Sequence, residues 1–156
     1  KVDKPTPIAH IGSRKAISML QRHLQETYQY LFDTAHRALC EGGSFAPFGA
    51  GIRKTGEQIH TNVDLPIDKS APADHISGLI AGFRADEEDN GLIAAGLVFD
   101  GRARSDDANA LCFHIEGANG RAVEVIVPYA RRPGDIIDFD EPQISEVQPE
   151  IFADVM

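Results

Sequence analysis

The feature of this sequence that most constrains its fold is a stripe of apolar residues that recur every three or four positions. Such spacing puts side chains on one face of an α-helix, and that face must be buried against another element. Ser13 can cap the first turn through its hydroxyl, and Gly42-Gly43 can end the helix. We therefore expect one long helix over Ile17, Leu20, Leu24, Tyr28, Leu31, Ala35 and Leu39.

Much of the remaining chain has the pattern of β-strands. Residues 92–99 form a nearly continuous apolar run, which is typical of a strand buried on both faces. Residues 111–116 alternate in the way expected of a half-buried strand, and Asn119-Gly120 predicts a type I′ hairpin turn after them. Further strands are expected at 50–53, 58–63, 122–129 and 136–139.

A second helix is expected after residue 71. Pro72 suits a first helical turn, because its missing N–H costs little there, and Asn90-Gly91 can end the helix. Its apolar stripe is Ile76, Leu79, Ile80 and Phe83. Between the two helices, Gly49 and Gly51 weaken a strand, so we expect another element, such as the first helix, to pack closely against them.

These elements predict an α+β fold in which two helices pack on a five- or six-stranded antiparallel sheet, in the order α-β-β-α-β-β-β. A chain of 156 residues can bury one core without disulfides or metals. We expect residues 1–12 to be an extended lead-in and residues 13–141 to be a single domain. Residues 142–156 are expected to be an acidic tail that packs weakly or against a partner.

This order of elements resembles that of profilin-like and roadblock/longin-like domains. The resemblance implies that the long third strand lies inside the sheet and that the first helix covers one face. The segment Phe45-Ala46-Pro47-Phe48-Gly49-Ala50 is also similar to an aromatic-x-Pro-Phe-Gly-Ala run that opens the sheet in small, uncharacterised bacterial proteins. That likeness extends loosely from Leu31 to Tyr129, and it implies no activity and no catalytic residues.

The charge of the chain is uneven along its length. The formal net charge is −9, and it divides into +3 for residues 1–60, −5 for residues 61–132 and −7 for residues 133–156. A pI near 5.0 argues against a nucleic-acid binder, because phosphate contacts need lysine and arginine. No apolar run approaches the roughly 18–20 residues of a membrane span. Cys40 and Cys112 form no CxxC pair, so we expect reduced, buried thiols and a cytoplasmic location.

Several side chains could form a small-molecule or metal pocket. His60 and His114, with Glu116 nearby, could hold a metal if their strands meet, and Cys112 near His114 could be a thiol nucleophile. We favour histidines on the solvent faces of their strands and a structural thiol, because these spacings are unspecific. No nucleotide-binding motif is present, and no group of residues has the spacing of a catalytic or metal site. We therefore expect no cofactor, no metal and no catalytic residue. The alternative pocket comprises Phe45, Phe48, His60, Cys112 and His114.

The acidic residues carry the leading functional hypothesis. We expect a non-enzymatic bacterial binding module, such as an acidic inhibitor or immunity-type protein for a basic partner, because charge complementarity speeds and selects such encounters. Two alternatives stay open. One is a small-ligand or metal-binding protein or enzyme that uses the pocket near Phe48, His60 and His114. The other is an oligomerisation domain that uses the sheet edge or the long helix. The expected binding residues are Asp86, Glu87, Glu88, Asp89, Asp135, Asp138, Asp140 and Glu141.

Overall fold

The computed structural model describes residues 21–42, 45–62, 72–103 and 108–152. The lead-in expected at residues 1–12 and the helix start expected at Ser13 lie outside these residues. Within them, no helix is long and apolar enough to cross a membrane.

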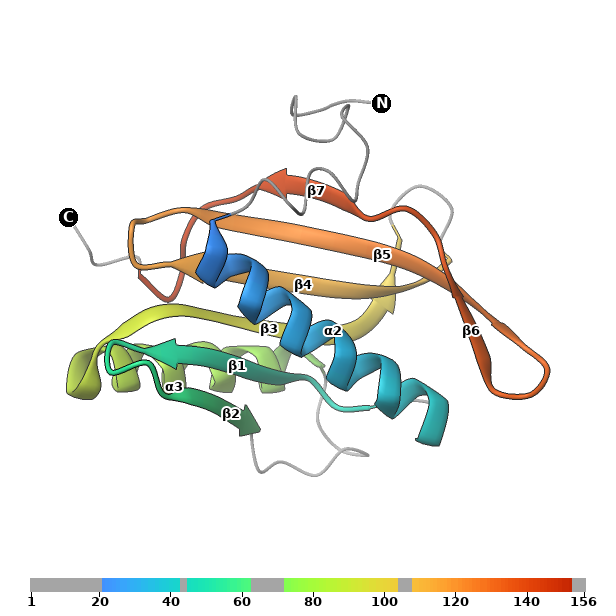
Figure 1. The fold of residues 1–156 in the computed structure, drawn as a ribbon, viewed down its shortest axis with the longest axis horizontal. Helices are drawn as coiled ribbons and strands as arrows, with labels where there is room; N and C mark the ends of the chain where they lie inside the picture. Colours follow the sequence, from blue (N-terminus) through green and yellow to red (C-terminus); the bar gives the residue numbers. More distant parts are fainter. Residues whose placement is uncertain (1–20, 43–44, 63–71, 104–107, 153–156) are drawn as a thin grey trace.

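Two helices and seven strands make up the described part of the chain (Figure 1). Helix α2 spans Arg22–Gly42 and helix α3 spans Pro72–Asn90, so both helices end where the sequence predicts. The strands are β1 (Phe48–Arg53), β2 (Gln58–Asn62), β3 (Leu92–Arg102), β4 (Asn109–Gly117), β5 (Ala122–Arg132), β6 (Ile136–Phe139) and β7 (Gln143–Glu146).

All strands belong to one antiparallel sheet with the order β2-β1-β3-β4-β5-β6. Strand β3 pairs with β1 on one side and β4 on the other, so it lies inside the sheet. Strands β6 and β7 both pair with β5 and follow one another along the same edge. The predicted α+β class and element order are confirmed. The sheet is larger than expected because residues 143–146 form a strand.

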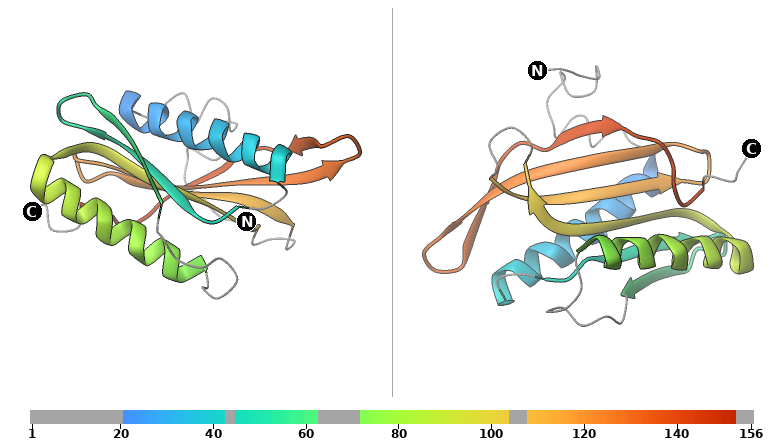
Figure 2. Two further views of the ribbon diagram at one scale, coloured as in Figure 1. Left: turned by 90° about the horizontal axis from the view of Figure 1, so that it is seen from below. Right: turned by 180° about the vertical axis from the view of Figure 1, so that it is seen from behind.

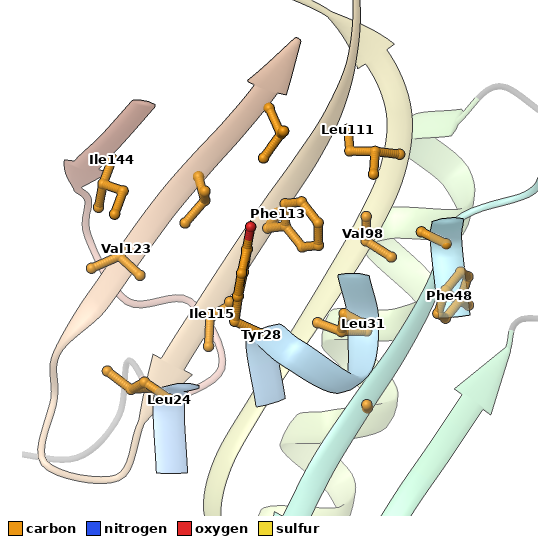
Figure 3. Close-up of a cluster of buried hydrophobic side chains, with 14 of the residues drawn as sticks. Leu24, Tyr28, Leu31, Phe48, Val98, Leu111, Phe113, Ile115, Val123 and Ile144 are labelled. Carbon is orange, nitrogen blue, oxygen red and sulfur yellow. The ribbon is translucent and has the colours of Figure 1, made fainter. Parts of the chain in front are cut away.

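Helix α2 covers one face of the sheet, where it crosses β1, β3 and β4 diagonally (Figure 1, Figure 2). Ile17 and Leu20 of the predicted stripe lie outside the described residues, and the stripe from Leu24 to Leu39 is buried, with no exposed surface on Leu24 or Leu31. Each such leucine stabilises the fold by about 1.5–3 kcal/mol relative to an exposed one. Figure 3 shows these side chains against one face of the sheet. Their partners there include Val98, Leu111, Phe113, Ile115, Val123, Val125, Val127 and Ile144.

Helix α3 covers part of the opposite face, over β2, β1 and β3 (Figure 2). The close approach that the sequence predicts at Gly49 is to this helix and not to the first one. A Cβ atom on Gly49 would lie 2.7 Å from the Phe83 ring and 2.9 Å from the carbonyl oxygen of Gly96. Odd-numbered residues of β1 face α3. Because Gly49 has no side chain, the Phe83 ring of α3 can contact the backbone of the sheet at this position.

The C-terminal segment does not form the weakly packed tail that the sequence predicts. Ile144 of β7 is buried in the α2-side core, and Ile151 and Phe152 are buried with Phe83 and Leu92 on the α3 side. We call residues 147–152 the strap, because they run from β7 across the sheet to α3. The tail expected to pack weakly is therefore integral to the fold as far as Phe152, because it supplies apolar surface that α3 does not.

The hairpin between β4 and β5 forms where the sequence predicts, but its turn type differs. Of the two turn residues, Gly120 alone has a positive φ, at 89°, so the turn is not type I′. Gly120 N–H donates to the Gly117 carbonyl at 3.0 Å, and Gly117 N–H donates to the Arg121 carbonyl at 2.8 Å. Three residues thus connect the strands, and such loops use a type I turn followed by a left-handed glycine.

The contact between Gly49 and Phe83 can be tested by substitution. Gly49→Ala is expected to lower the free energy of unfolding by about 1–3 kcal/mol, because the added methyl group has no space. Gly82→Ala is the matched control, since a Cβ there meets nothing within 4 Å and its helical position favours alanine. The control should raise stability by about 0.5–1 kcal/mol in urea unfolding. A neutral Gly49→Ala would contradict the packing described here.

Candidate functional site

A hollow of about 440 Å³ opens between α2 and the edge of the sheet. It lies where β6 ends and β7 has not yet begun, and we call residues 140–142 the β6–β7 break. We call the cavity the acidic hollow. Its lining consists of Tyr28, Gln29, Phe32, Val127, Phe139, Asp140, Glu141 and Pro142.

Two prolines account for the break in the edge strand. Pro128 of β5 and Pro142 have no backbone N–H, so the strand ladder loses donors on both sides at this point. A single backbone hydrogen bond, from Asp140 N–H to the Pro128 carbonyl at 2.8 Å, connects the break to β5. The chain therefore bends away from a regular ladder here, which leaves the hollow beside α2.

Aromatic rings form one wall of the hollow. The ring centroids of Phe32 and Phe139 lie 4.8 Å apart, and those of Tyr28 and Phe32 lie 5.9 Å apart. The Tyr28 ring also packs on Phe113 at 4.9 Å, within the core drawn in Figure 3. These tilted contacts are favourable arrangements for aromatic rings, so helix and strand hold the wall in place.

Tyr28 contributes a hydroxyl group to the lining of the hollow. The residue is 6 % exposed, and its hydroxyl has no hydrogen-bond partner among the described residues. Burial, with repulsion from the Asp33 carboxylate, raises the pKa of Tyr28 well above its usual value. The hydroxyl therefore stays protonated, and both its proton and its lone pairs are available to a ligand.

Two carboxylates stand at the rim. Asp140 and Glu141 are exposed, and their one mutual contact is a hydrogen bond from Glu141 N–H to Asp140 Oδ1 at 2.8 Å. Neither forms an ion pair with a lysine or arginine of the described residues. Within the described part of the chain, the rim therefore has two negative charges and no cation paired with them.

The nearby arginines are engaged elsewhere. Arg131 donates to the Leu39 carbonyl at 3.1 Å and lies over the Tyr129 ring, so its charge sits at the negative end of the α2 dipole. Arg132 pairs with Asp138 across the β5–β6 hairpin. Asp138 is thus neutralised within the chain, although the sequence analysis placed it among the partner-binding residues.

The acidic residues of α3 form a separate group. Arg53 donates to both oxygens of Asp86, at 3.0 and 3.1 Å, and Glu87 accepts from Leu92 N–H at 2.8 Å. The hydrogen bonds from Arg53 hold the pKa of Asp86 below its usual range. Asp86 therefore links α3 to β1 and Glu87 secures the turn from α3 to β3, while Glu88 and Asp89 are exposed.

The expected acidic residues do not make one continuous surface. The last turn of α3, with Asp86–Asp89, and the β5–β6 hairpin lie toward opposite ends of the molecule (Figure 1, Figure 2). Asp135 lies in the hairpin turn, where it adopts a positive φ of 61°. Asp140 and Glu141 line the acidic hollow, whereas Asp86 lines a separate hollow beside β2, where Arg53 pairs with it.

The alternative pocket is only half assembled. Phe45 and Phe48 lie 5.5 Å apart, and the His60 ring stacks on Phe48 at 5.3 Å. His60 Nδ1 also makes a 2.8 Å hydrogen bond with the hydroxyl of Tyr30. These residues are on the α2 side of the sheet, and His60 is exposed at edge strand β2, as the sequence analysis favoured.

The other half of that pocket, Cys112 and His114, lies on the opposite face of the sheet. His60 pairs with Ala50, which pairs with Gly96 of β3, whereas His114 pairs with Leu97, the next residue of β3. Because successive residues of a strand point to opposite faces, the two histidines lie on opposite faces of the sheet. A pocket that joins His60 to His114 is therefore wrong, because the sheet separates them. Among the described residues, no three His, Cys, Asp or Glu side chains gather to hold a metal ion. Cys112 is buried, and Cys40 is half-buried against the α2-side core.

Glu116 was expected on a solvent-facing side of its strand, but it is fully buried. Its carboxylate accepts three consecutive backbone N–H groups of the strap, from Glu150 at 2.6 Å, Ile151 at 2.9 Å and Phe152 at 3.0 Å. His114 Nε2 lies 2.5 Å from the same carboxylate, and Arg84 donates to the Glu150 carbonyl at 2.6 Å. These contacts fasten the strap to β4 and α3.

The pKa of Glu116 reflects two opposing effects. Burial favours the neutral acid and would raise the pKa, but the hydrogen bonds from His114 and the three strap amides favour the carboxylate. The hydrogen bonds prevail, and the pKa lies below its usual value. Glu116 is therefore ionised near neutral pH and has a structural role in holding the strap.

The acidic hollow brings together aromatic walls, the Tyr28 hydroxyl and two carboxylates that no cation of the described residues pairs with. No protein-family model, curated protein or solved structure matches this chain. The rim residues Asp140 and Glu141 were among the predicted binding residues, but Phe32 and Phe139 of the aromatic wall were not. One signal was available, because Phe32 and His36 continue from Tyr28 of the stripe as an aromatic row at steps of four residues.

The strap contact can be tested with Glu116→Gln. We expect the free energy of unfolding to fall by about 2–4 kcal/mol at neutral pH, because the amide replaces one acceptor oxygen with donors that face backbone N–H groups. Glu88→Gln, on the exposed side of α3, is the control and should change stability by less than about 0.5 kcal/mol. Urea unfolding measures both.

The same pair of proteins gives a pH test. Because folding lowers the pKa of Glu116, its stabilisation is fully present above the unfolded pKa of about 4.3 and is lost as the pH falls through the folded value. The stability difference between wild type and Glu116→Gln should therefore shrink on acidification. A difference that stays constant from about pH 7 to about pH 3 would contradict this assignment.

Proposed function

We propose that this protein is a non-enzymatic binding module that docks a basic protein partner at the acidic hollow. The observation that carries the proposal is the pair of exposed carboxylates, Asp140 and Glu141, that no described cation neutralises at the rim of an aromatic-walled cavity. Aromatic surface with a charged rim is typical of protein-binding sites, where a desolvated centre supplies affinity and the rim supplies orientation.

Charge supports a basic partner. Residues 133–156 contribute −7 to the net charge and contain no lysine or arginine. Because a field of one sign attracts oppositely charged proteins, it raises the rate of encounter and disfavours acidic competitors. An inhibitor or immunity-type protein needs this property, because it must find a basic toxin or nuclease quickly among other proteins.

Of the two acidic groups, the one on α3 and the one at the hollow, the contacts within the chain favour the hollow as the docking surface. The carboxylates of Asp86 and Glu87 already serve contacts within the chain, so a partner would have to compete with Arg53 and with a backbone amide. Among the described residues, no cation competes for Asp140 or Glu141, and the N–H of Glu141 occupies only one oxygen of Asp140. We therefore assign docking to the hollow, and we use the exposed carboxylates at the end of α3 as the control in the experiment.

The proposal is tested by affinity capture, from the cells that make the protein, with two matched double variants. Asp140→Asn/Glu141→Gln removes both rim charges, and Glu88→Gln/Asp89→Asn removes two exposed charges from α3. Wild type and the α3 variant are expected to retain a protein of basic pI, and the rim variant to lose it. Titration with that purified partner should show a rise in Kd of about tenfold for the rim variant, since two exposed charge pairs of up to about 1 kcal/mol each are lost.

Salt provides the second arm of this experiment. Binding should weaken as salt rises from about 0.05 M to about 0.3 M, because the rim charges are exposed and screened. Capture of neutral or acidic proteins alone would contradict a basic partner. Equal loss of binding in both double variants would contradict docking at the hollow, because it would show dependence on overall charge only.

A further inference from the structure

We propose that the acidic hollow is a receptor site for the side chain of an arginine on the partner. This inference rests on the proposed function, and it specifies which chemical group enters the cavity. Three observations carry it: the aromatic wall of Phe32 and Phe139, the two rim carboxylates, and the hydroxyl of Tyr28, none of which pairs with a cation or donor side chain of the described residues.

The dimensions and the apolar lining suit a long side chain. A volume of about 440 Å³ lies within the range of pockets that enclose small ligands. Val127 and Pro142 give the hollow apolar surface, against which the three methylene groups of arginine can pack. The charged end can then meet Asp140 and Glu141 while the stem stays out of water.

The guanidinium group fits this lining better than the ammonium group of lysine. It is planar and weakly hydrated, so it can stack on an aromatic ring and give up water at lower cost. Its several N–H donors can serve more than one acceptor at once, and here the acceptors are carboxylates and the oxygen of Tyr28. A lysine would place one compact, strongly hydrated charge in the same space.

The hollow has a net negative charge, because the described arginines near it are bound to other groups. Arg131 and Arg132, the arginines of the neighbouring hairpin, are bound to the end of α2 and to Asp138. Gln29, at the rim, donates to Asp33 at 2.9 Å, so a further carboxylate lies one turn along α2. An arginine of the partner would therefore enter a site of net negative charge that no described side chain already fills.

The test uses three blocked tripeptides, Gly-Arg-Gly, Gly-Lys-Gly and Gly-citrulline-Gly, titrated into the full chain and followed by two-dimensional NMR of the backbone amides. Citrulline has nearly the shape of arginine but carries no charge. We expect the arginine peptide to shift the signals of Gln29, Phe32, Phe139 and Glu141, with a Kd at least about tenfold lower than that of the citrulline peptide.

Variants locate the contribution of each part. Asp140→Asn/Glu141→Gln should raise the Kd of the arginine peptide by at least about tenfold, and Phe32→Leu should raise it about threefold to tenfold, because it removes a cation–π contact. Glu88→Gln/Asp89→Asn should leave it within about twofold. Thermal unfolding checks that Phe32→Leu remains folded.

The outcomes separate this inference from the proposed function. Equal binding of the lysine and arginine peptides at the hollow would overturn the arginine assignment and leave a basic partner in place. Equal binding of arginine and citrulline, or shifts confined to Asp86–Asp89, would overturn the receptor site. If the rim variant loses the captured partner but no peptide binds to the wild type, the arginine site is rejected and the docking of a basic partner at the hollow is retained.

Discussion

The structure depends on a mismatch between the width of its sheet and the width of a helix. A helix with its side chains is about 10–12 Å across, whereas six adjacent strands at about 4.8 Å spacing extend over roughly 24 Å. One helix on each face therefore cannot cover the sheet. Helix α2 lies diagonally and reaches β1, β3 and β4, while α3 lies over β2, β1 and β3. Helix α2 also reaches β6, but both helices leave part of the β5 side of the sheet to be covered by other segments.

The two faces solve this problem differently. On the α3 side, the strap crosses the uncovered region, and Ile151 and Phe152 fill the space beside Phe83. The buried carboxylate of Glu116 makes this possible, because it satisfies three strap amides that would otherwise lose their hydrogen bonds. On the α2 side, Phe139 covers part of the gap and the β6–β7 break leaves the rest open as the acidic hollow.

Local patterns predicted most of the fold. The stripe from Leu24 to Leu39, the apolar run of β3 and the alternation in β4 each determine an element and its buried face, because they depend on neighbours in sequence. Gly49 was correctly interpreted as a close contact, but its partner Phe83 is 34 positions away and no local pattern names it. The turn after β4 differed because its type depends on how many residues the two strands leave unpaired.

The candidate site was harder to predict, because it is made by long-range contacts. Asp140 and Glu141 were visible as acidic residues, yet so were Asp86 and Asp138, which the fold pairs with Arg53 and Arg132. Which carboxylates stay free is decided by tertiary structure. Likewise, Glu116 follows the polar alternation of a solvent-facing strand, and only the return of the strap accounts for its burial.

The central claim is that the part of the α2 face left uncovered is where a basic partner binds. The most direct measurement is photo-crosslinking with a photoreactive residue in place of Gln29, at the rim of the hollow, and in place of Glu88, on α3. The account predicts a covalent product with one basic protein from the Gln29 position and none from the Glu88 position. A product from Glu88 alone would contradict it and place the docking surface at the other end of the molecule.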